Sequence, residues 1–158
     1  MGDHVLAEIG EDDWRDFRDL RLEALAVAPA AFGSRHEDWV DAPEERWRDR
    51  LRAVPFNVLA RSDGVPVGMV SATVGGDEVE LISMYVAPAA RGTGLAGELV
   101  GRVVAWAADQ GLPTALMVRS DNARAITAYE RAGFVDEGVP AGWPEDEPPE
   151  NRMVRPLE

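Results

Sequence analysis

The chain has 158 residues, of which 46% are hydrophobic and 28% are charged, and this predicts one folded domain spanning residues 1–158 rather than a disordered chain. Its 29 acidic residues outnumber 16 basic ones, all of them Arg, and the formal net charge of -13 argues against nucleic acid and favours a cationic partner. With no Cys, the chain has no disulfide, thiolate nucleophile or Cys-based metal site, and only His4 and His36 as imidazole ligands, so no metal is expected.

The amino-terminal segment lacks a basic flank followed by a long apolar run. No stretch reaches the roughly 18 apolar residues that a membrane-spanning helix needs. We therefore expect a cytoplasmic protein with no membrane partner. The oligomeric state stays open, with a homodimer as one option.

The first half of the chain predicts a strand, two helices and a three-stranded antiparallel meander. Apolar residues at three- and four-residue spacing favour the first helix, which Pro29 ends, and Pro43 suits the first turn of the second. Asp63-Gly64 and Gly75-Gly76 favour tight turns between the strands. The expected elements are a strand at 3–9, helices at 14–28 and 43–53, an irregular connection at 30–41, and strands at 56–61, 65–74 and 78–86.

The second half predicts two helices and three short strands around a glycine-rich turn. The helices are expected at 94–110 and 122–132 and the strands at 116–119, 134–139 and 153–157, with a loop rich in Pro, Gly and acids at 140–150. This order of elements predicts a mixed α+β fold.

The turn Arg91-Gly92-Thr93-Gly94-Leu95-Ala96-Gly97 joins a strand to a helix. Such a turn directs backbone N–H groups and the positive end of a helix at one point, which favours an anion, although a sharp turn alone is the alternative. Its glycines satisfy G-x-G-x-x-G, but residues 87–91 separate them from the strand and too few residues follow for a doubly wound sheet. A triphosphate-binding loop is excluded because it requires Lys.

Two motifs in order resemble the general-control-type N-acetyltransferase (GNAT) superfamily. Met84-Tyr85-Val86-Ala87-Pro88 and the turn after it are similar to its acetyl-CoA motif, [Q/R]-x-x-G-x-[G/A], which Arg91, Gly94 and Ala96 fill. Residues 118–134 resemble its second signature through Asn122, Ala125, Tyr129, Gly133 and Phe134. The resemblance implies a GNAT-like, mostly antiparallel sheet of six to seven strands, flanked by about four helices, and an N-acetyltransferase that uses acetyl-CoA.

The resemblance also implies roles for individual residues in binding acetyl-CoA. Backbone N–H groups of the turn would hold the pyrophosphate, and the strand that precedes the turn would pair with the pantetheine arm and polarise the thioester. Asn122 is either a cofactor ligand or simply the cap of its helix. The expected cofactor-binding residues are Met84, Tyr85, Val86, Arg91, Gly92, Thr93, Gly94, Leu95, Ala96, Asn122 and Arg124.

Without Cys, no thioester-linked enzyme intermediate can form, so acetyl transfer to a primary amine is expected to be direct, in a ternary complex. The amine must lose a proton before it attacks. Glu80, which simple alternation places on one face with Ile82 and Met84, is the candidate base, with a water chain or a solvent-facing role as alternatives. By resemblance, Tyr129 would be the general acid for the leaving thiolate, with core packing as the alternative.

The resemblance places the acceptor amine between residues 31–41 and 140–150, with Phe32, Ser34 and Trp143 as candidate substrate residues. Acids in both segments would attract a small-molecule or peptide amine of positive charge, or would only solvate exposed loops. Polyamines, aminoglycoside-like amines, protein amino termini or lysines, and small metabolites all remain open. A non-catalytic acyl-CoA sensor and an acidic protein-interaction module are the alternative functions.

Overall fold

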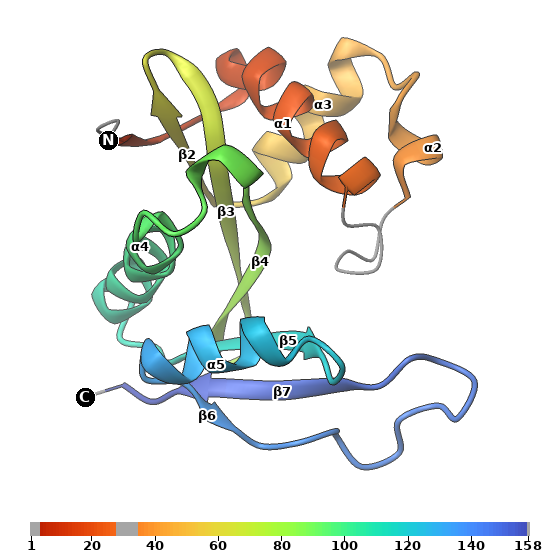
Figure 1. The fold of residues 1–158 in the computed structure, drawn as a ribbon, viewed down its shortest axis with the longest axis vertical. Helices are drawn as coiled ribbons and strands as arrows, with labels where there is room; N and C mark the ends of the chain where they lie inside the picture. The colour runs from red at the N-terminus through yellow and green to blue at the C-terminus, as the bar shows by residue number, and fades with distance from the viewer. Residues whose placement is uncertain (1–3, 28–34, 158) are drawn as a thin grey trace.

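The structure, a computed structural model, describes residues 4–27 and 35–157 and contains a mixed sheet of seven strands with helices on both faces (Figure 1). The strand order is β1-β2-β3-β4-β5-β7-β6, and β4–β5 is the parallel pair in this otherwise antiparallel sheet. This confirms the α+β fold class. The strands are β1 (His4–Glu8), β2 (Phe56–Ser62), β3 (Val65–Gly75), β4 (Glu78–Val86), β5 (Thr114–Arg119), β6 (Val135–Asp136) and β7 (Glu150–Arg155).

The helices form two groups along the chain. They are α1 (Trp14–Val27), α2 (His36–Trp39), α3 (Glu44–Ala53), α4 (Leu95–Asp109) and α5 (Ala123–Arg131), with 3₁₀ turns η1 (Glu11–Asp13) and η3 (Pro88–Ala90). The first three pack together on one side of the sheet, and α4 and α5 lie on the other (Figure 1). Among the described residues, none of these helices is long and apolar enough to cross a membrane.

Alternation along the strands divides the core into two hydrophobic clusters. On the α4 face, Val58 and Leu81 pack with Leu99 of α4, whose buried side chains recur every four residues. On the α1 face, Leu59 and Met69 pack with buried aromatic side chains of α1 and α3. The sheet therefore separates two compartments, and a side chain's position along a strand decides which one it enters.

Strand β4 contains one extra residue, which reverses its alternation. Met69 of β3 lies opposite Tyr85 of β4, and Ser71 of β3 lies opposite Ile82 of β4. A step of two residues along β3 therefore matches a step of three along β4. Ser83 takes up the extra residue with a φ of 55°, in the left-handed region. Consequently Met84 packs into the α4 cluster and Tyr85 into the α1 cluster.

The parallel pairing of β4 with β5 is short. The two strands share the pairs Val79 with Thr114 and Glu80 with Ala115, and no further pair is formed toward their carboxyl ends. The rest of β4 therefore has its hydrogen-bonding edge toward β5 unmatched by a strand, and an opening forms there.

Several predicted boundaries were wrong. The short helix α2 lies within the segment predicted as irregular, and residues 28–34 of that region lie outside the described residues. The strand predicted at 134–139 pairs only at β6, because Asp136 Oδ1 accepts the N–H of Gly138 at 2.8 Å and Gly138 turns with a φ of 76°. The last strand runs over 150–155 rather than 153–157, since its register with β5 begins at Glu150.

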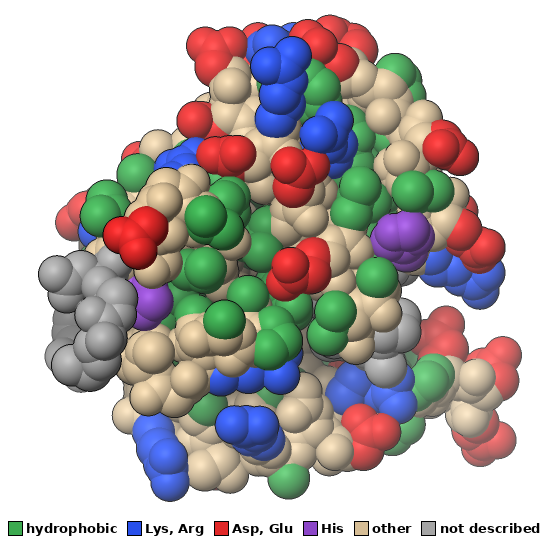
Figure 2. All heavy atoms as spheres, turned by 45° about the horizontal axis from the view of Figure 1, so that its top comes forward, with side chains coloured by type: hydrophobic (Ala, Val, Ile, Leu, Met, Phe, Trp, Pro, Cys, Tyr) green, Lys and Arg blue, Asp and Glu red, His purple; other side chains and the backbone are tan. Residues whose placement is uncertain are grey.

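The surface is acidic overall, with arginines distributed among the acids (Figure 2). Arg52 of α3 donates to Glu11 Oε2 at 2.6 Å, and Arg48 donates to Asp12 Oδ1 at 3.1 Å. These pairs join η1 to α3, which helps to fix α1 and α3 on their face of the sheet.

Candidate active site

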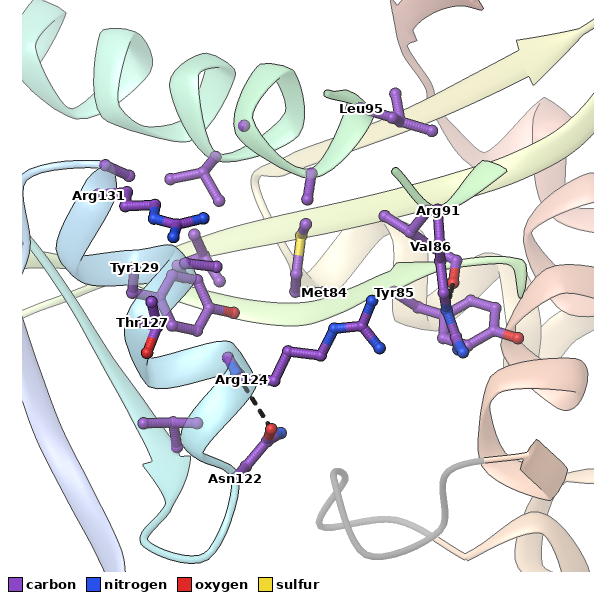
Figure 3. Close-up of a pocket in the computed structure, with 18 of the residues that line it drawn as sticks. Met84, Tyr85, Val86, Arg91, Leu95, Asn122, Arg124, Thr127, Tyr129 and Arg131 are labelled. Carbon is purple, nitrogen blue, oxygen red and sulfur yellow. Dashed lines mark hydrogen bonds between the residues drawn. The ribbon is translucent and has the colours of Figure 1, made fainter. Parts of the chain in front are cut away.

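A cavity of about 980 Å³ lies where β4 and β5 separate (Figure 3). One wall is the carboxyl half of β4, the end wall is the turn into α4, and the opposite wall is the end of β5 with α5. Every one of these segments comes from residues 81–132, so the cavity joins the two predicted motifs.

The glycine turn presents backbone N–H groups to the cavity. Gly92 and Gly94 have φ angles of 78° and 85°, which glycine adopts readily and other residues rarely. Gly94 precedes α4 as its N-cap, and Ala96 and Gly97 of the first helical turn line the cavity. Because the first N–H groups of a helix lack intrahelical acceptors, this end of the cavity suits an anion.

Side chains outside the cavity hold the turn in shape. The Thr93 hydroxyl donates to the Ala90 carbonyl at 2.6 Å, and Nε2 of His4 on β1 lies 3.1 Å from the same hydroxyl oxygen. Thr93, a predicted cofactor ligand, therefore stabilises the turn and does not line the cavity. Leu95, another predicted ligand, touches the cavity but has a side chain only 1% exposed in the core.

Arginines line the cavity from several elements. Arg91 donates from Nε to the Val86 carbonyl at 3.2 Å, and Arg124 and Arg131 come from α5 (Figure 3). All three are exposed, so their charges are available to an anionic ligand that enters from solvent. Asn122 also lines the cavity, and its Oδ1 accepts the N–H of Ala125 at 3.1 Å, which makes it the N-cap of α5.

Tyr129 of α5 directs its hydroxyl into the cavity, toward Met84 of β4 (Figure 3). Its ring packs edge-on against Phe134, with ring centroids 5.7 Å apart. Burial raises the pKa of Tyr129 to about 12, so the hydroxyl keeps its proton at neutral pH.

The predicted β4 residues divide between the two faces of the sheet. Met84 and Val86 pack on the α4 face and line the cavity. Tyr85 lines the cavity too, but its hydroxyl donates to Glu23 Oε2 of α1 at 2.8 Å on the other face. Burial, followed by the hydrogen bond to Glu23, raises the pKa of Tyr85 to about 12.

Glu80 lies outside the cavity lining, exposed, at the last β4–β5 pair. The expectation that it shares a face with Met84 was wrong, because the extra residue at Ser83 reverses the alternation between them. Glu80 points to the α1 face, like Ile82 before the bulge.

The predicted substrate residues do not line the cavity as described. Phe32 and Ser34 lie outside the described residues. Trp143 is half-buried in the loop between β6 and β7 and is not part of the cavity lining.

Comparison with known proteins identifies the class of this site. The model of the acetyltransferase (GNAT) family matches residues 8–134. The chain belongs to the GNAT acetyltransferase family. A relative from Mycobacterium tuberculosis, named as an uncharacterized N-acetyltransferase, is 37% identical over 127 residues, covering 75% of this chain and 80% of that one. A mycothiol acetyltransferase of Streptomyces griseus is 35% identical over 134 residues, 79% of this chain and 43% of that one.

Solved structures share the GNAT fold. An acetyltransferase of the GNAT family from Streptococcus pneumoniae superposes with a TM-score of 0.80 at 19% identity, covering 99% of this chain and 100% of that chain. An N-acetyltransferase from Thermoplasma acidophilum, solved in complex with coenzyme A, has a TM-score of 0.77 at 14% identity, covering 98% and 99%. This GNAT chain is therefore an enzyme of the N-acetyltransferase class with the family's fold.

Sequence reasoning missed several residues that line the cavity. Arg131, the last residue of α5, lines the cavity. Ser83 on β4 and Met117 on β5 line it as well. Arg131 could have been found from the sequence, because it is a basic residue two positions after Tyr129 in the second signature. The sequence held no indication of the role of Ser83, because a bulge depends on how β4 pairs with β3 rather than on residue type.

Proposed function

We propose that this GNAT enzyme transfers the acetyl group of acetyl-CoA directly to a primary amine while both are bound together. The observation that carries the proposal is one cavity with an anion-binding turn at its end, an unpaired strand edge along its wall and the Tyr129 hydroxyl opposite. Acetyl-CoA supplies an activated acetyl thioester, and the chain supplies the groups that bind and orient it.

The cofactor residues fit a long anionic ligand. Backbone N–H groups of residues 92–97 would bind the pyrophosphate, supported by the exposed charges of Arg91 and Arg124. The β5-facing edge of β4 at residues 84–86 would pair with the amide groups of the pantetheine arm, as an added strand does. A backbone N–H at this edge would polarise the thioester carbonyl.

In the transfer, the amine nitrogen forms a bond to the acetyl carbon and the carbon–sulfur bond breaks. Tyr129 would donate its proton to the leaving sulfur, which its raised pKa of about 12 makes available throughout the neutral range. The hydroxyl direction in Figure 3, toward Met84, supports this role.

Glu80 remains our candidate for the base, acting from the α1 face. It lies at the point where β4 and β5 separate, so the opening between the strands begins beside it. It would accept the proton of the acceptor amine directly or through a water molecule.

The acceptor is proposed to be a cationic small molecule or peptide. Acidic residues of the loop between β6 and β7, Glu145, Asp146 and Glu147, are exposed and would attract it. Phe32, Ser34 and Trp143 stay predictions for its contacts. Because the Streptomyces griseus relative is named a mycothiol acetyltransferase, small-molecule amines are the first class to test.

A thermal-shift titration followed by an amine panel tests the proposal. Acetyl-CoA is expected to raise the melting temperature, and at least one amine should then release CoA thiol. Release without a matching N-acetylated product, detected by mass spectrometry, would contradict transfer to an amine. A rise in melting temperature without release of CoA thiol by any amine would identify an acyl-CoA sensor. No change in melting temperature would exclude both the enzyme and the sensor.

A further inference from the structure

A cluster of polar side chains, of which Asn57 and Ser71 are buried and Arg50 and Ser83 half-buried, lies beneath the β4 bulge on the α1 face of the sheet. Arg50 of α3 donates from Nη1 to Asn57 Oδ1 at 3.1 Å, and from Nη2 to Ser71 Oγ at 3.3 Å and Ser83 Oγ at 3.1 Å. Asn57, Ser71 and Ser83 belong to β2, β3 and β4. One guanidinium therefore joins three neighbouring strands, and we call these four residues the Arg50 cluster.

The Arg50 cluster coincides with the bulge. Ser71 is the β3 residue at which the register to β4 shifts, and Ser83 is the β4 residue with a φ of 55°. A serine in the left-handed region costs about 1–2 kcal/mol relative to an extended one. The hydrogen bond from Arg50 offsets part of this cost, because it forms with Ser83 in its bulged position.

Ser83 also connects the cluster to the active site. Its neighbour Met84 packs on the cavity side, Tyr85 packs on the α1 side, and all three residues line the cavity. If Ser83 returned to an extended conformation, the residues after it would change faces. The strand edge proposed to bind the thioester would then be displaced.

The cluster is an unfavourable way to stabilise a fold. Arg50 lies over the ring of Phe17, 5.2 Å from its centroid, and its hydrogen-bond acceptors are neutral. Burial, and then the like charge of Arg21, lower the pKa of Arg50 to about 10. A buried charge of this kind commonly contributes less to stability than an apolar side chain of similar size. Its benefit is therefore to be sought in the shape of β4.

We propose that Arg50 is a positioning residue for acetyl transfer, which holds Ser83 in the bulge and so directs the β4 backbone that lines the cavity. This inference rests on the proposed function. Arg50 acts through Ser83, from the face of the sheet opposite the cavity.

Four variants test the inference: Arg50→Met, Arg50→Lys, Ser83→Ala and the double variant Arg50→Met with Ser83→Gly. Arg50→Met is expected to lower kcat about tenfold or more, since displacement of a reacting group by about 1 Å costs up to about 100-fold, with little change in acceptor KM. The kcat of Arg50→Lys should lie between those of wild type and Arg50→Met, because the Lys ammonium lacks the forked guanidinium donors that reach three strands. Ser83→Ala should resemble Arg50→Met.

The double variant gives the decisive result. Glycine adopts a positive φ without help, so Ser83→Gly should restore part of the kcat lost in Arg50→Met. A purely structural role for Arg50 would not predict this rescue. Arg46→Met is the matched control, since Arg46 lies on the same helix, stacks over Trp39 at 4.0 Å and donates its hydrogen bond to the Asp38 carbonyl at 2.6 Å.

A readout without catalysis separates failure of this inference from failure of the proposed function. Amide hydrogen exchange at residues 83–85 should accelerate in Arg50→Met and not in Arg46→Met, whether or not an acceptor has been found. Unchanged exchange and unchanged kcat in Arg50→Met would overturn the inference. A rise in acceptor KM alone would also overturn it, because Arg50 would then bind the acceptor.

Discussion

The two side chains assigned to proton transfer, Tyr129 and Glu80, come from opposite sides of the sheet. Tyr129 reaches the cavity from α5, whereas Glu80 points to the α1 face at the last β4–β5 pair. This separation is compatible with direct transfer, because the amine attacks the acetyl carbon from one direction and the sulfur leaves in another. Each residue therefore makes its own prediction.

Tyr129→Phe is expected to lower kcat by about 100-fold and to leave the affinity for acetyl-CoA nearly unchanged, because general acid catalysis contributes on this scale. Steady-state release of CoA thiol and an equilibrium titration measure the two effects. Because burial raises the pKa of Tyr129 to about 12, the wild-type kcat should show no fall from tyrosine ionisation below about pH 10.

The other tyrosine provides the control. Tyr85→Phe removes a hydroxyl that contacts Glu23 on the α1 face and keeps the backbone that lines the cavity. Its kcat should change much less than that of Tyr129→Phe. Equal losses in the two variants would argue that Tyr129 acts through packing alone.

Glu80→Gln is expected to lower kcat/KM by about tenfold or more at neutral pH, and by less at alkaline pH where the acceptor amine is already neutral, since the amide cannot accept a proton. The pH dependence of kcat/KM measures this. Asp77→Asn is the matched control, because it removes one negative charge from the exposed turn that leads into the same strand. A kcat/KM at neutral pH that is unchanged in Glu80→Gln would point to water as the proton acceptor.

At the scale of elements, the turn into α4 combines a conformational demand with a binding role. Gly94 and Gly76 both have positive φ angles, 85° and 62°, and a Cβ added to either would meet no atom within 4 Å. Alanine at either position is therefore strained by backbone conformation alone, at a cost of about 1 kcal/mol. The two sites differ in that only Gly94 lines the cavity.

Gly94→Ala and Gly76→Ala should consequently destabilise the fold to a similar extent, while Gly94→Ala alone raises the Kd for acetyl-CoA by about tenfold or more. Thermal denaturation compares the stabilities, and isothermal titration compares the affinities. Similar affinities in the two variants would exclude a direct role for the N–H groups of this turn in cofactor binding.

At the scale of the whole molecule, the two halves of the sheet meet at a short parallel pair and are joined further by an ion pair. Arg152 of β7 donates to both carboxylate oxygens of Glu78 on β4, at 2.8 and 2.6 Å. This hydrogen bonding lowers the pKa of Glu78 below its usual range. The pair links strands on either side of the opening that forms the active site.

A carboxylate with a lowered folded-state pKa stabilises the fold above its unfolded pKa, and this contribution is lost as the pH falls through the folded value. Glu78→Gln should therefore lower the free energy of unfolding by about 1 kcal/mol at pH 7, and the difference from wild type should shrink below about pH 4. Urea denaturation at both pH values measures it. Glu130→Gln, which removes an exposed charge from α5, should show no comparable pH dependence.

The local features of this protein were predictable from its amino-acid sequence alone. The spacing of apolar residues specified α1, α4 and α5, the Asp63-Gly64 and Gly75-Gly76 pairs specified the meander turns, and the two GNAT motifs specified the turn and Tyr129. These features were predictable because helix periodicity, positive φ angles and helix capping depend on residues close together in the chain.

The face that each β4 residue occupies was not predictable locally, because it depends on contacts between distant segments of the chain. The bulge at Ser83 results from the register of β4 against β3 and from Arg50, which approaches from α3 more than thirty residues earlier in the chain. For the same reason the sequence misplaced Glu80 relative to Met84. The limits of β7 likewise follow its register against β5, a pairing between distant segments. Side-chain direction in a sheet has a period of two, so a single extra residue, set by distant partners, reverses everything beyond it.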